Sequence, residues 1–445
     1  MSAKQAATLI TSRRFLPLLG AQIFGAFNDQ FLKLALITLV TWKELSIAGM
    51  EANVLTPIAG SAFTLPFFLF SAMAGQVADK YDKAFVLLRV KQAEIFIMLL
   101  AAFALIANIP ILMLVTVALM GAQSAFFSPT RNSVLPQWLK KEELVTGNAV
   151  ISGLVSIAVL LGMAMGIFLI TTTNGPKTVS LILVTFAFFG WLSIRQAPPA
   201  PSQSPDIKID KWIIPTIFRT LRFAFKNPNV LRPMLGTAWY YWIVAAILIL
   251  MPIYIKDVLH YQPIVFMVVM GLFTFGAIFG AVTCMLFAKD NRAIYMSAFG
   301  ALGLAAINFD LFFICQDIQN LGFNGFIPAT ETTEAVMGSL DSFLSMPNTP
   351  HFMIALFLSA IMASMFVIPL NALAQQRAEA THRARLLAAG ALLLNAATTL
   401  SQLMVMGLGL MAIAPHYTFA ILGVVTTLIM LYVFYRAGIL KKEAI

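Results

Sequence analysis

The feature that most constrains this chain is a long apolar stretch, Leu18–Val40, that carries Asn28, Asp29 and Lys33 in its interior. About 20 apolar residues, rising about 1.5 Å each in a helix, cross the hydrocarbon core of a bilayer, so the stretch is long enough to span a membrane. A charged group in such a span is costly unless it pairs or faces water. Because Asp29 and Lys33 are four residues apart, they share one helix face and can pair. We expect the other helices to build a cavity around this polar stripe.

The composition indicates a polytopic helical membrane protein. Of the 445 residues, 60% are hydrophobic and 11% are charged, and the mean hydropathy is +0.87, which excludes an ordinary soluble protein. The apolar runs are long and continuous, whereas the strands of a transmembrane barrel show short alternating segments. The net charge of +10 is explained by basic residues in alternate loops, as the positive-inside rule requires, so no nucleic acid partner is predicted.

The apolar runs predict an all-α fold with twelve spanning helices. The predicted spans cover residues 15–41, 52–78, 84–107, 110–130, 144–171, 178–195, 231–255, 262–288, 293–315, 351–374, 386–412 and 418–436. The loops that carry most of the basic residues lie on the side of both termini. Both termini are therefore predicted to be cytoplasmic, in a multi-pass protein of the bacterial inner membrane.

Residues 196–228 divide the chain into an N-terminal six-helix bundle, 1–195, and a C-terminal six-helix bundle, 229–445. The first part of this segment is rich in Pro and Ser, which predicts an extended linker. The second part, WIIPTIFRTLRFAFKN, has apolar and basic residues at helical spacing, which predicts an amphipathic helix on the inner leaflet. This plan of six spans, a cytoplasmic linker and six more spans resembles the major facilitator superfamily.

A short motif between the second and third spans strengthens that resemblance. Its residues, at the spacing of the superfamily's signature loop, are Gly75, Asp79, Lys80 and Lys83. Gly75 permits close helix approach. The resemblance implies that Asp79 faces the start of the eleventh span near Arg385, and forms a charge relay with Arg131, as a latch on the cytoplasmic side. Asp82 departs from the pattern, which has Gly there.

Three further stretches resemble the bacterial lysophospholipid transporter family. They are GAFND at 25–29 with Lys33, FSPTRNSVLP at 127–136 and IPLNALAQQR at 368–377. The last most resembles the transporter portion of fusions with acyl-acyl-carrier-protein synthetase and acyltransferase. The resemblance implies inward movement of lysophospholipids, such as lysophosphatidylethanolamine, from the outer to the inner leaflet. It also implies membrane lipids as surroundings and a cytoplasmic acyltransferase or synthetase as a partner for re-acylation. Gln30 and Asn132 depart from common family residues, which leaves the headgroup preference open.

A lysolipid needs a polar pocket for its headgroup beside an apolar path for one acyl chain. The candidate substrate-binding residues are Asn28, Asp29, Lys33, Glu94, Gln123, Tyr240 and Asn371. Glu94 lies three residues from Lys91, so it is either half of a structural pair or a functional carboxylate. The aromatic residues of the second and seventh spans are candidates for the acyl path, although such spans more often face lipid.

No catalytic triad, P-loop or metal-ligand cluster is present in the sequence, so neither enzymatic activity nor a cofactor is predicted. Two alternatives to lysolipid transport stay open. One is a drug or small-solute exporter, since the same fold serves many substrates. The other is a non-transporting anchor for a cytoplasmic acyltransferase, which the costly charges of the first span argue against.

Overall fold

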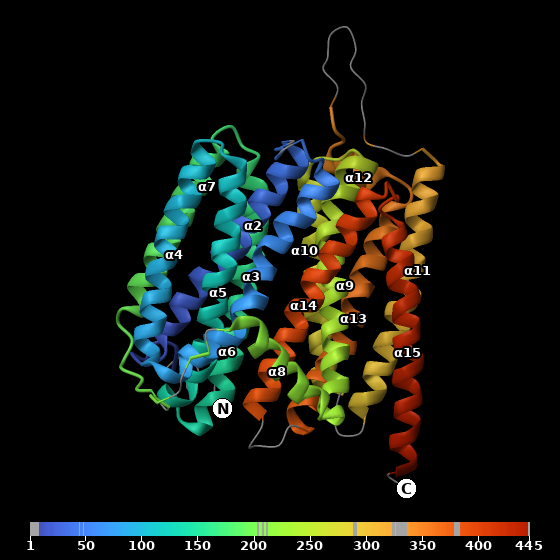
Figure 1. Ribbon diagram of the computed structural model, residues 1–445. Coiled ribbons are helices and arrows are strands. Elements are labelled where there is room, and N and C mark those ends of the chain that lie inside the picture. Colours follow the sequence, from blue (N-terminus) through green and yellow to red (C-terminus); the bar gives the residue numbers. More distant parts are fainter. Residues whose placement is uncertain are drawn as a thin grey trace. The chain divides into compact units, whose positions relative to one another are not determined.

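The computed structural model describes residues 9–43, 45–47, 49–202, 204–206, 209–210, 212–287, 292–322, 325, 336–377 and 383–443 (Figure 1). These residues form α-helices and one π-helical turn, and contain no β-strand. The predicted all-α fold of a polytopic membrane protein is confirmed.

The chain divides into two compact units. The first contains residues 1–50 and 59–221, and the second contains residues 51–58 and 222–445. The helices of the first unit are α2 (Leu16–Trp42), most of α3 (Ala52–Lys80), α4 (Lys83–Ile106), α5 (Pro110–Trp138), α6 (Lys141–Ile170) and α7 (Gly175–Ile194). Helix α8 (Ile213–Phe225) crosses the boundary. The second unit contains α9 (Pro228–Ile253), the π-turn η1 (Tyr254–Val258), α10 (Pro263–Phe287), α11 (Arg292–Asn320), α12 (Leu340–Ser345), α13 (Thr349–Arg377), α14 (Arg383–Leu410) and α15 (Tyr417–Glu443).

Twelve long helices occupy the places of the twelve predicted spans, and eleven of them are apolar enough to qualify as membrane spans by composition. The exception is α4, which carries Lys83, Arg89, Lys91 and Glu94. Its length of 24 residues is sufficient for a span. The charges that lower its hydropathy belong in part to an interior ion pair, described below.

In the first unit, α2 packs against α6 and α7, and α4 packs against α5 and α7. Glycines permit the closest of these contacts. A Cβ atom at Gly162 or Gly166 of α6 would lie 2.5 or 2.6 Å from the backbone oxygens of Phe27 or Phe31 on α2. Backbones that approach this closely replace side-chain interdigitation with direct van der Waals contact, as small-xxx-small spacing allows in membrane helices.

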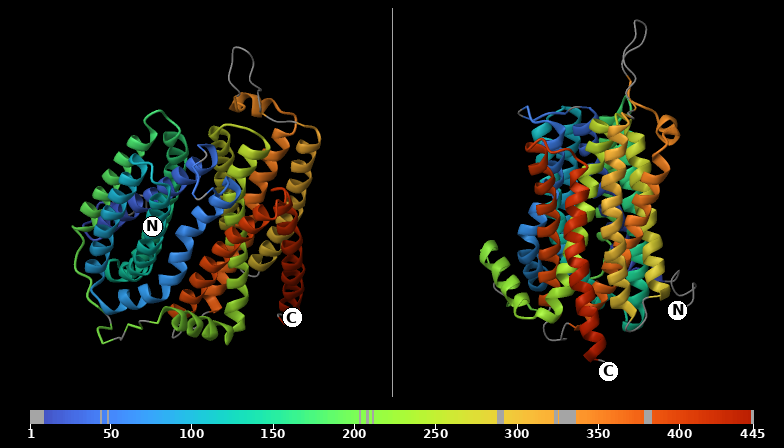
Figure 2. Two further views of the ribbon diagram at one scale, coloured as in Figure 1. Left: turned by 45° about the horizontal axis from the view of Figure 1, so that its top comes forward. Right: turned by 90° about the vertical axis from the view of Figure 1, so that its right-hand side faces the viewer.

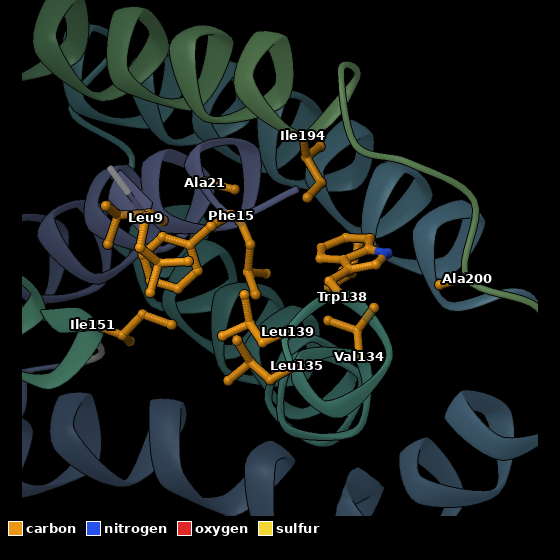
Figure 3. Close-up of a cluster of buried hydrophobic side chains, with 13 residues drawn as sticks. Leu9, Phe15, Ala21, Val134, Leu135, Trp138, Leu139, Ile151, Ile194 and Ala200 are labelled. Carbon is orange, nitrogen blue, oxygen red and sulfur yellow. The ribbon is translucent and has the colours of Figure 1, made fainter. Parts of the chain in front are cut away.

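A cluster of buried apolar side chains closes one end of the first unit (Figure 3). Phe15 from the start of α2 packs there with Trp138 and Leu139 from the end of α5 and with Ile194 from the end of α7. Ala200 of the linker belongs to the same cluster and is fully buried. The linker is therefore part of the packed structure of this unit.

The linker is also hydrogen-bonded to the loop between α3 and α4, and the left view of Figure 2 shows it running along the end of the first unit. The Ala200 N–H donates to Asp82 Oδ2 at 3.0 Å, and the Lys83 N–H donates to the Ala200 oxygen at 2.9 Å. Two residues further on, Ser202 Oγ donates to the backbone oxygen of Asp79 at 2.9 Å.

The linker's second attachment is Asp210, which also organises the start of α8. Its N–H donates to Gln76 Oε1 of α3 at 2.7 Å. Its carboxylate accepts from the Trp212 N–H at 3.1 Å and from Thr216 Oγ1 at 2.9 Å, and pairs with Arg219. The backbone bond from Trp212 and then the Thr216 hydroxyl hold the pKa of Asp210 below its usual value. The linker segment is therefore joined to α3 at one side and to α8 at the other.

In the second unit, α13 packs against α9, α10 and α11, α9 packs against α14, and α11 packs against α15. Glycine contacts recur here, because a Cβ at Gly276 or Gly280 of α10 would lie 2.5 or 2.6 Å from the backbone oxygens of Phe357 or Ile361 on α13. In both units, glycines therefore allow helix backbones to approach closely.

Candidate functional site

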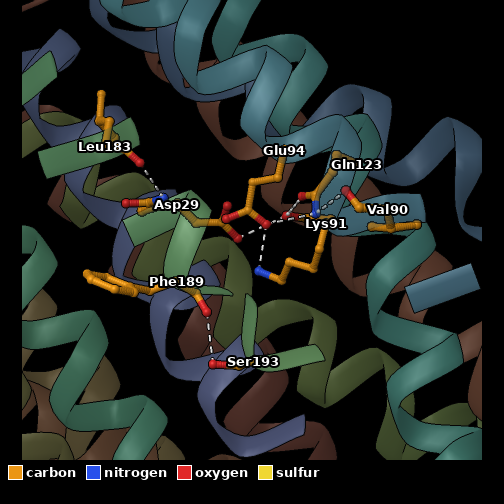
Figure 4. Close-up of polar contacts among 10 residues, drawn as sticks. Asp29, Val90, Lys91, Glu94, Gln123, Leu183, Phe189 and Ser193 are labelled. Atoms are coloured by element: carbon orange, nitrogen blue, oxygen red, sulfur yellow. Dashed lines mark hydrogen bonds and ion pairs between the residues drawn. The ribbon is translucent and has the colours of Figure 1, made fainter. Parts of the chain in front are cut away.

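The interior of the first unit contains an ion pair with almost no exposure. Lys91 Nζ lies 2.6 Å from Glu94 Oε2, and the two side chains are 1% and 2% exposed. The same carboxylate oxygen accepts from Gln123 Nε2 of α5 at 3.1 Å (Figure 4). Glu94 Oε1 is also buried and has no hydrogen-bond partner among the described residues. The open choice for Glu94 is therefore resolved in part: it forms the pair with Lys91 and keeps one oxygen free.

Asp29 of α2 faces this pair. Its Oδ2 accepts from Ser124 Oγ of α5 at 2.9 Å, and in Figure 4 the carboxyl groups of Asp29 and Glu94 point toward each other. Lys33 Nζ, one turn along α2, lies over the ring of Phe63 at 5.6 Å from its centroid. No ion pair joins Asp29 and Lys33, although both are described.

The ion pair that the spacing of Asp29 and Lys33 allows is therefore not formed in this structure. The physical reason is tertiary. A hydroxyl donor on α5 binds the carboxylate and an aromatic ring on α3 attracts the ammonium, so each charge contacts a different neighbouring helix. One turn of α2 consequently presents a carboxylate and an ammonium that form no direct ion pair with each other.

Gly25 explains how the ammonium of Lys91 fits beside α2. A Cβ at Gly25 would overlap with Lys91 Nζ. The ammonium also lies 4.9 Å from the centroid of the Phe127 ring. Asn28, by contrast, is fully buried and its Nδ2 donates to the backbone oxygen of Leu183 on α7 at 3.1 Å. The described contact of Asn28 is therefore a bond between helices.

Two predicted site residues, Tyr240 and Asn371, lie in the second unit. The Tyr240 ring meets the Tyr241 ring edge-on with centroids 5.0 Å apart. Asn371 Oδ1 of α13 accepts from Thr237 Oγ1 of α9 at 3.0 Å. This contact joins two helices of the second unit, and both of its members are uncharged.

The predicted charge relay between Asp79 and Arg131 is not formed. Both nitrogens of Arg131 that make hydrogen bonds donate to Asn132 Oδ1, at 3.0 and 2.8 Å. Asp79 contributes its backbone oxygen to the linker, through Ser202, and has no ion pair among the described residues. In this structure the Arg131 guanidinium therefore binds the side-chain oxygen of Asn132.

The other predicted latch residues differ in their surroundings. No described atom lies within 4 Å of a Cβ placed at Gly75. Lys80 Nζ lies 6.0 Å from the centroid of the Tyr81 ring. Lys83 is fully buried and its Nζ has no hydrogen-bond partner among the described residues. Arg385 falls in the first turn of α14, and its side chain lies outside the described part.

Asp82, the departure from the superfamily pattern, has a clear structural role. Its Oδ1 accepts from the Phe85 N–H at 2.9 Å and caps α4, while its Oδ2 accepts from Ala200. An Asp immediately before a helix is a recognisable capping signal in the sequence. Its second bond, to the linker, has no sequence signal because it joins residues more than a hundred positions apart.

Ser124 and Lys91 are contacts of the site that the predicted set of binding residues omits. Ser124 directly follows Gln123 in an otherwise apolar stretch, and this polar pair was the available signal. For metals, the described residues contain no group of three or more His, Cys, Asp or Glu side chains positioned to hold an ion.

The fold and the sequence together define the class of protein. A sequence profile of the Major Facilitator Superfamily matches residues 18–328, so the chain belongs to that superfamily. It shares its fold with an auto-inhibited POT family peptide transporter, with a TM-score of 0.68 and 10% identity over 96% of this chain and 97% of the other. A bacterial homologue of the iron transporter ferroportin in an inward-facing state gives a TM-score of 0.62 and 13% identity over 98% and 99%. These likenesses concern the fold alone.

The relatives found by sequence similarity are transporters named for one class of substrate. The chain is 28% identical over 170 residues to the lysophospholipid transporter LplT of Photorhabdus laumondii subsp. laumondii, covering 38% of this chain and 39% of that protein. It is 26% identical over 157 residues to LplT of Yersinia pestis (strain Pestoides F), covering 35% and 36%. The matched region spans well under half the length of these curated relatives. The chain is thus a multi-pass membrane protein of the superfamily with distant similarity to LplT.

Proposed function

We propose that this protein carries lysophospholipids, with lysophosphatidylethanolamine as the main substrate, from the outer to the inner leaflet of the bacterial inner membrane. The observation that carries the proposal is the pair of separated charges on α2. Asp29 and Lys33 lie one turn apart in a spanning helix, and neither forms an ion pair among the described residues. Charges of this kind within a membrane are functional sites by default.

The two charges suit a zwitterionic headgroup. A phosphoethanolamine group carries an anionic phosphate and a cationic amine a few bonds apart. In the proposed complex the Lys33 ammonium binds the phosphate. The amine binds the Asp29 carboxylate and the free Oε1 of Glu94. The Lys91–Glu94 pair holds Glu94 in place, and Ser124 does the same for Asp29.

An apolar path lies beside the same charges. Phe63 of α3, under the Lys33 ammonium, lies 6.4 Å between centroids from Phe67, and Phe70 lies 6.1 Å from Phe126 of α5. One saturated acyl chain requires only a narrow apolar surface, which these rings supply. A lysolipid bound through its headgroup to α2 therefore has an apolar wall for its single chain.

The remaining parts of the proposal follow from the predicted topology. Both termini are cytoplasmic, residues 1–195 and 229–445 form the two bundles, and transport proceeds by alternating access. Asp79, Arg131 and Arg385 form the cytoplasmic latch in a state other than the one described. Delivered lysolipid is re-acylated by a cytoplasmic acyltransferase or acyl-acyl-carrier-protein synthetase.

The test is lysophosphatidylethanolamine uptake into energised spheroplasts that lack their own transporter. Lys33→Met and Asp29→Asn should each reduce uptake at least about tenfold at normal abundance, because each removes a charge-assisted contact with the headgroup. Lys177→Met, which removes one exposed charge in the first turn of α7, is the matched control and should transport normally.

Two outcomes would contradict the proposal. Wild-type uptake by the double variant Asp29→Asn/Lys33→Met would remove the polar stripe from substrate binding. Dye efflux without lipid uptake by the unaltered protein would favour the exporter alternative instead.

A further inference from the structure

The second unit contains a pocket that the proposed transport site does not use. It has a volume of about 250 Å³ and lies between α9, α11, α13 and α15. Most of its wall is apolar, with Leu235 of α9, Leu370 and Leu373 of α13, and Ile429 of α15 among the lining residues. Asp29, Lys33 and Glu94 belong to the first unit, and neither Tyr240 nor Asn371 is among the described lining residues, so the pocket differs from the candidate substrate site.

Two arginines stand in the wall of this apolar pocket. Arg232 is in the second turn of α9 and Arg377 is the last residue of α13. Both side chains are exposed, and neither has an ion-pair or hydrogen-bond partner among the described residues. No acidic residue is among the described residues that line the pocket. Within the described part of the chain, the site combines two guanidinium groups that have no acidic partner with an apolar cavity.

We infer that this pocket binds an anionic diacyl glycerophospholipid of the membrane. The two guanidinium groups bind the phosphate, since Arg presents paired donors that match phosphate oxygens. Part of one acyl chain fills the cavity. Its volume is below the roughly 300–1,000 Å³ of sites that enclose a whole small molecule, so the rest of the lipid lies along the protein surface.

The position of Arg232 and Arg377 in the fold is consistent with binding an anionic lipid. They lie at the end of the unit where α9 begins and α13 ends, which is the end that the basic loops predict to be cytoplasmic. The cytoplasmic leaflet contains anionic lipids, and basic pockets between spanning helices bind their headgroups. A free phosphate ion shares the headgroup chemistry but gains nothing from the apolar cavity, so the pocket distinguishes a lipid from an ion.

The experiment uses the purified full chain and native mass spectrometry to follow binding of phosphatidylglycerol, with phosphatidylethanolamine as the zwitterionic comparison. Arg232→Gln/Arg377→Gln should raise the apparent Kd for phosphatidylglycerol at least about tenfold. The matched control is Arg222→Gln/Lys226→Gln, which removes two exposed charges close by in the sequence and should change the Kd less than about twofold. Ile429→Phe, which fills the cavity and leaves both arginines, should also weaken binding.

Several results would overturn the inference. An equal loss in the control variant would show general charge attraction. Competition by inorganic phosphate equal to that of the lipid would show an ion site, and unchanged binding by Ile429→Phe would show that the cavity is not used. The variant Asp29→Asn/Lys33→Met should keep wild-type phosphatidylglycerol binding whether or not it transports lysolipid. Loss of binding there would contradict a separate site.

Discussion

The two units bury different kinds of polar group between their helices. The first unit places the Lys91–Glu94 ion pair and the carboxylate of Asp29 among α2, α4 and α5. The second unit joins its helices through neutral groups: Thr237 with Asn371, and Trp239 Nε1 with Thr426 Oγ1 at 3.2 Å. The Asp310–His351 contact and the Lys256–Asp257 pair of the second unit are more exposed, with side-chain exposures of 43% and 61% and of 13% and 38%.

Close glycine contacts are common to the two six-helix bundles, whereas a fully buried ion pair is described only in the first. Glycine-to-backbone contacts occur in both units, at Gly162 and Gly166 and at Gly276 and Gly280, so they belong to packing. An ion pair with almost no exposure occurs only in the first unit among the described spanning helices. Because burying an ion pair has a large desolvation cost, a bundle that can do without it has no structural reason to keep it. This supports a binding role for the charges of the first unit.

The largest expected effect is the loss of one member of the interior ion pair. Lys91→Met leaves the Glu94 carboxylate buried without its ammonium, and should cost about 3–5 kcal/mol of stability. Thermal unfolding in detergent and abundance in the membrane measure this loss. Lys91→Met/Glu94→Gln should be more stable than Lys91→Met alone, because no uncompensated charge remains. A double variant less stable than both single variants would show that the pair contributes more than charge compensation.

The next effect tests the feature that the units share. Gly162→Ala in the first unit and Gly276→Ala in the second each place a Cβ atom 2.5 Å from a backbone oxygen of the facing helix. Each should cost about 1–3 kcal/mol through overpacking, measured by the same unfolding assay. Gly75→Ala is the control, since nothing lies within 4 Å of its Cβ position. A cost confined to one unit would show that the two bundles are not packed by the same rule.

A smaller effect is expected from the neutral contacts of the second unit. Thr237→Val keeps the shape of the side chain and removes its hydrogen bond to Asn371. Hydrogen bonds between membrane helices average about 0.6 kcal/mol, so this substitution should lower stability by about that amount. A loss as large as that of Lys91→Met would erase the contrast between the two units.

The smallest effect concerns an ion pair at the edge of the first unit. The Glu143 carboxylate accepts from the Lys140 N–H at 2.9 Å and pairs with Arg14 at 2.6 Å, and these two contacts hold the pKa of Glu143 below its usual value. Stability from a carboxyl with a lowered pKa is present above its unfolded pKa and is lost as the pH falls through its folded pKa. Glu143→Gln should therefore destabilise by a few tenths of a kcal/mol at neutral pH and by nothing in strong acid. An equal difference at both pH values would exclude the charge as its source.

The sequence predicts the helices well because span length and apolar character are local properties. It predicts Glu94 beside Lys91 for the same reason, since three residues on one helix fix the geometry. The same local rule fails for Asp29 and Lys33, because Ser124 on α5 and Phe63 on α3 are nearer partners that only the packing of helices supplies. The contact from Asp79 to Arg131 is likewise not formed in this structure, in which Arg131 donates to the neighbouring Asn132. Which charges meet is therefore decided by helix rotation and packing.

The attachment of the linker changes what that segment can do mechanically. An unattached Pro- and Ser-rich linker of this length would change its extension when its ends move, and would transmit little of that movement. Here Ala200, Ser202 and Asp210 are tied to the α3–α4 loop and to α3, so little slack remains before α8 begins. A displacement of the α3–α4 loop is then transmitted to α8, because only a few residues lie between the last attached residue, Asp210, and the start of α8.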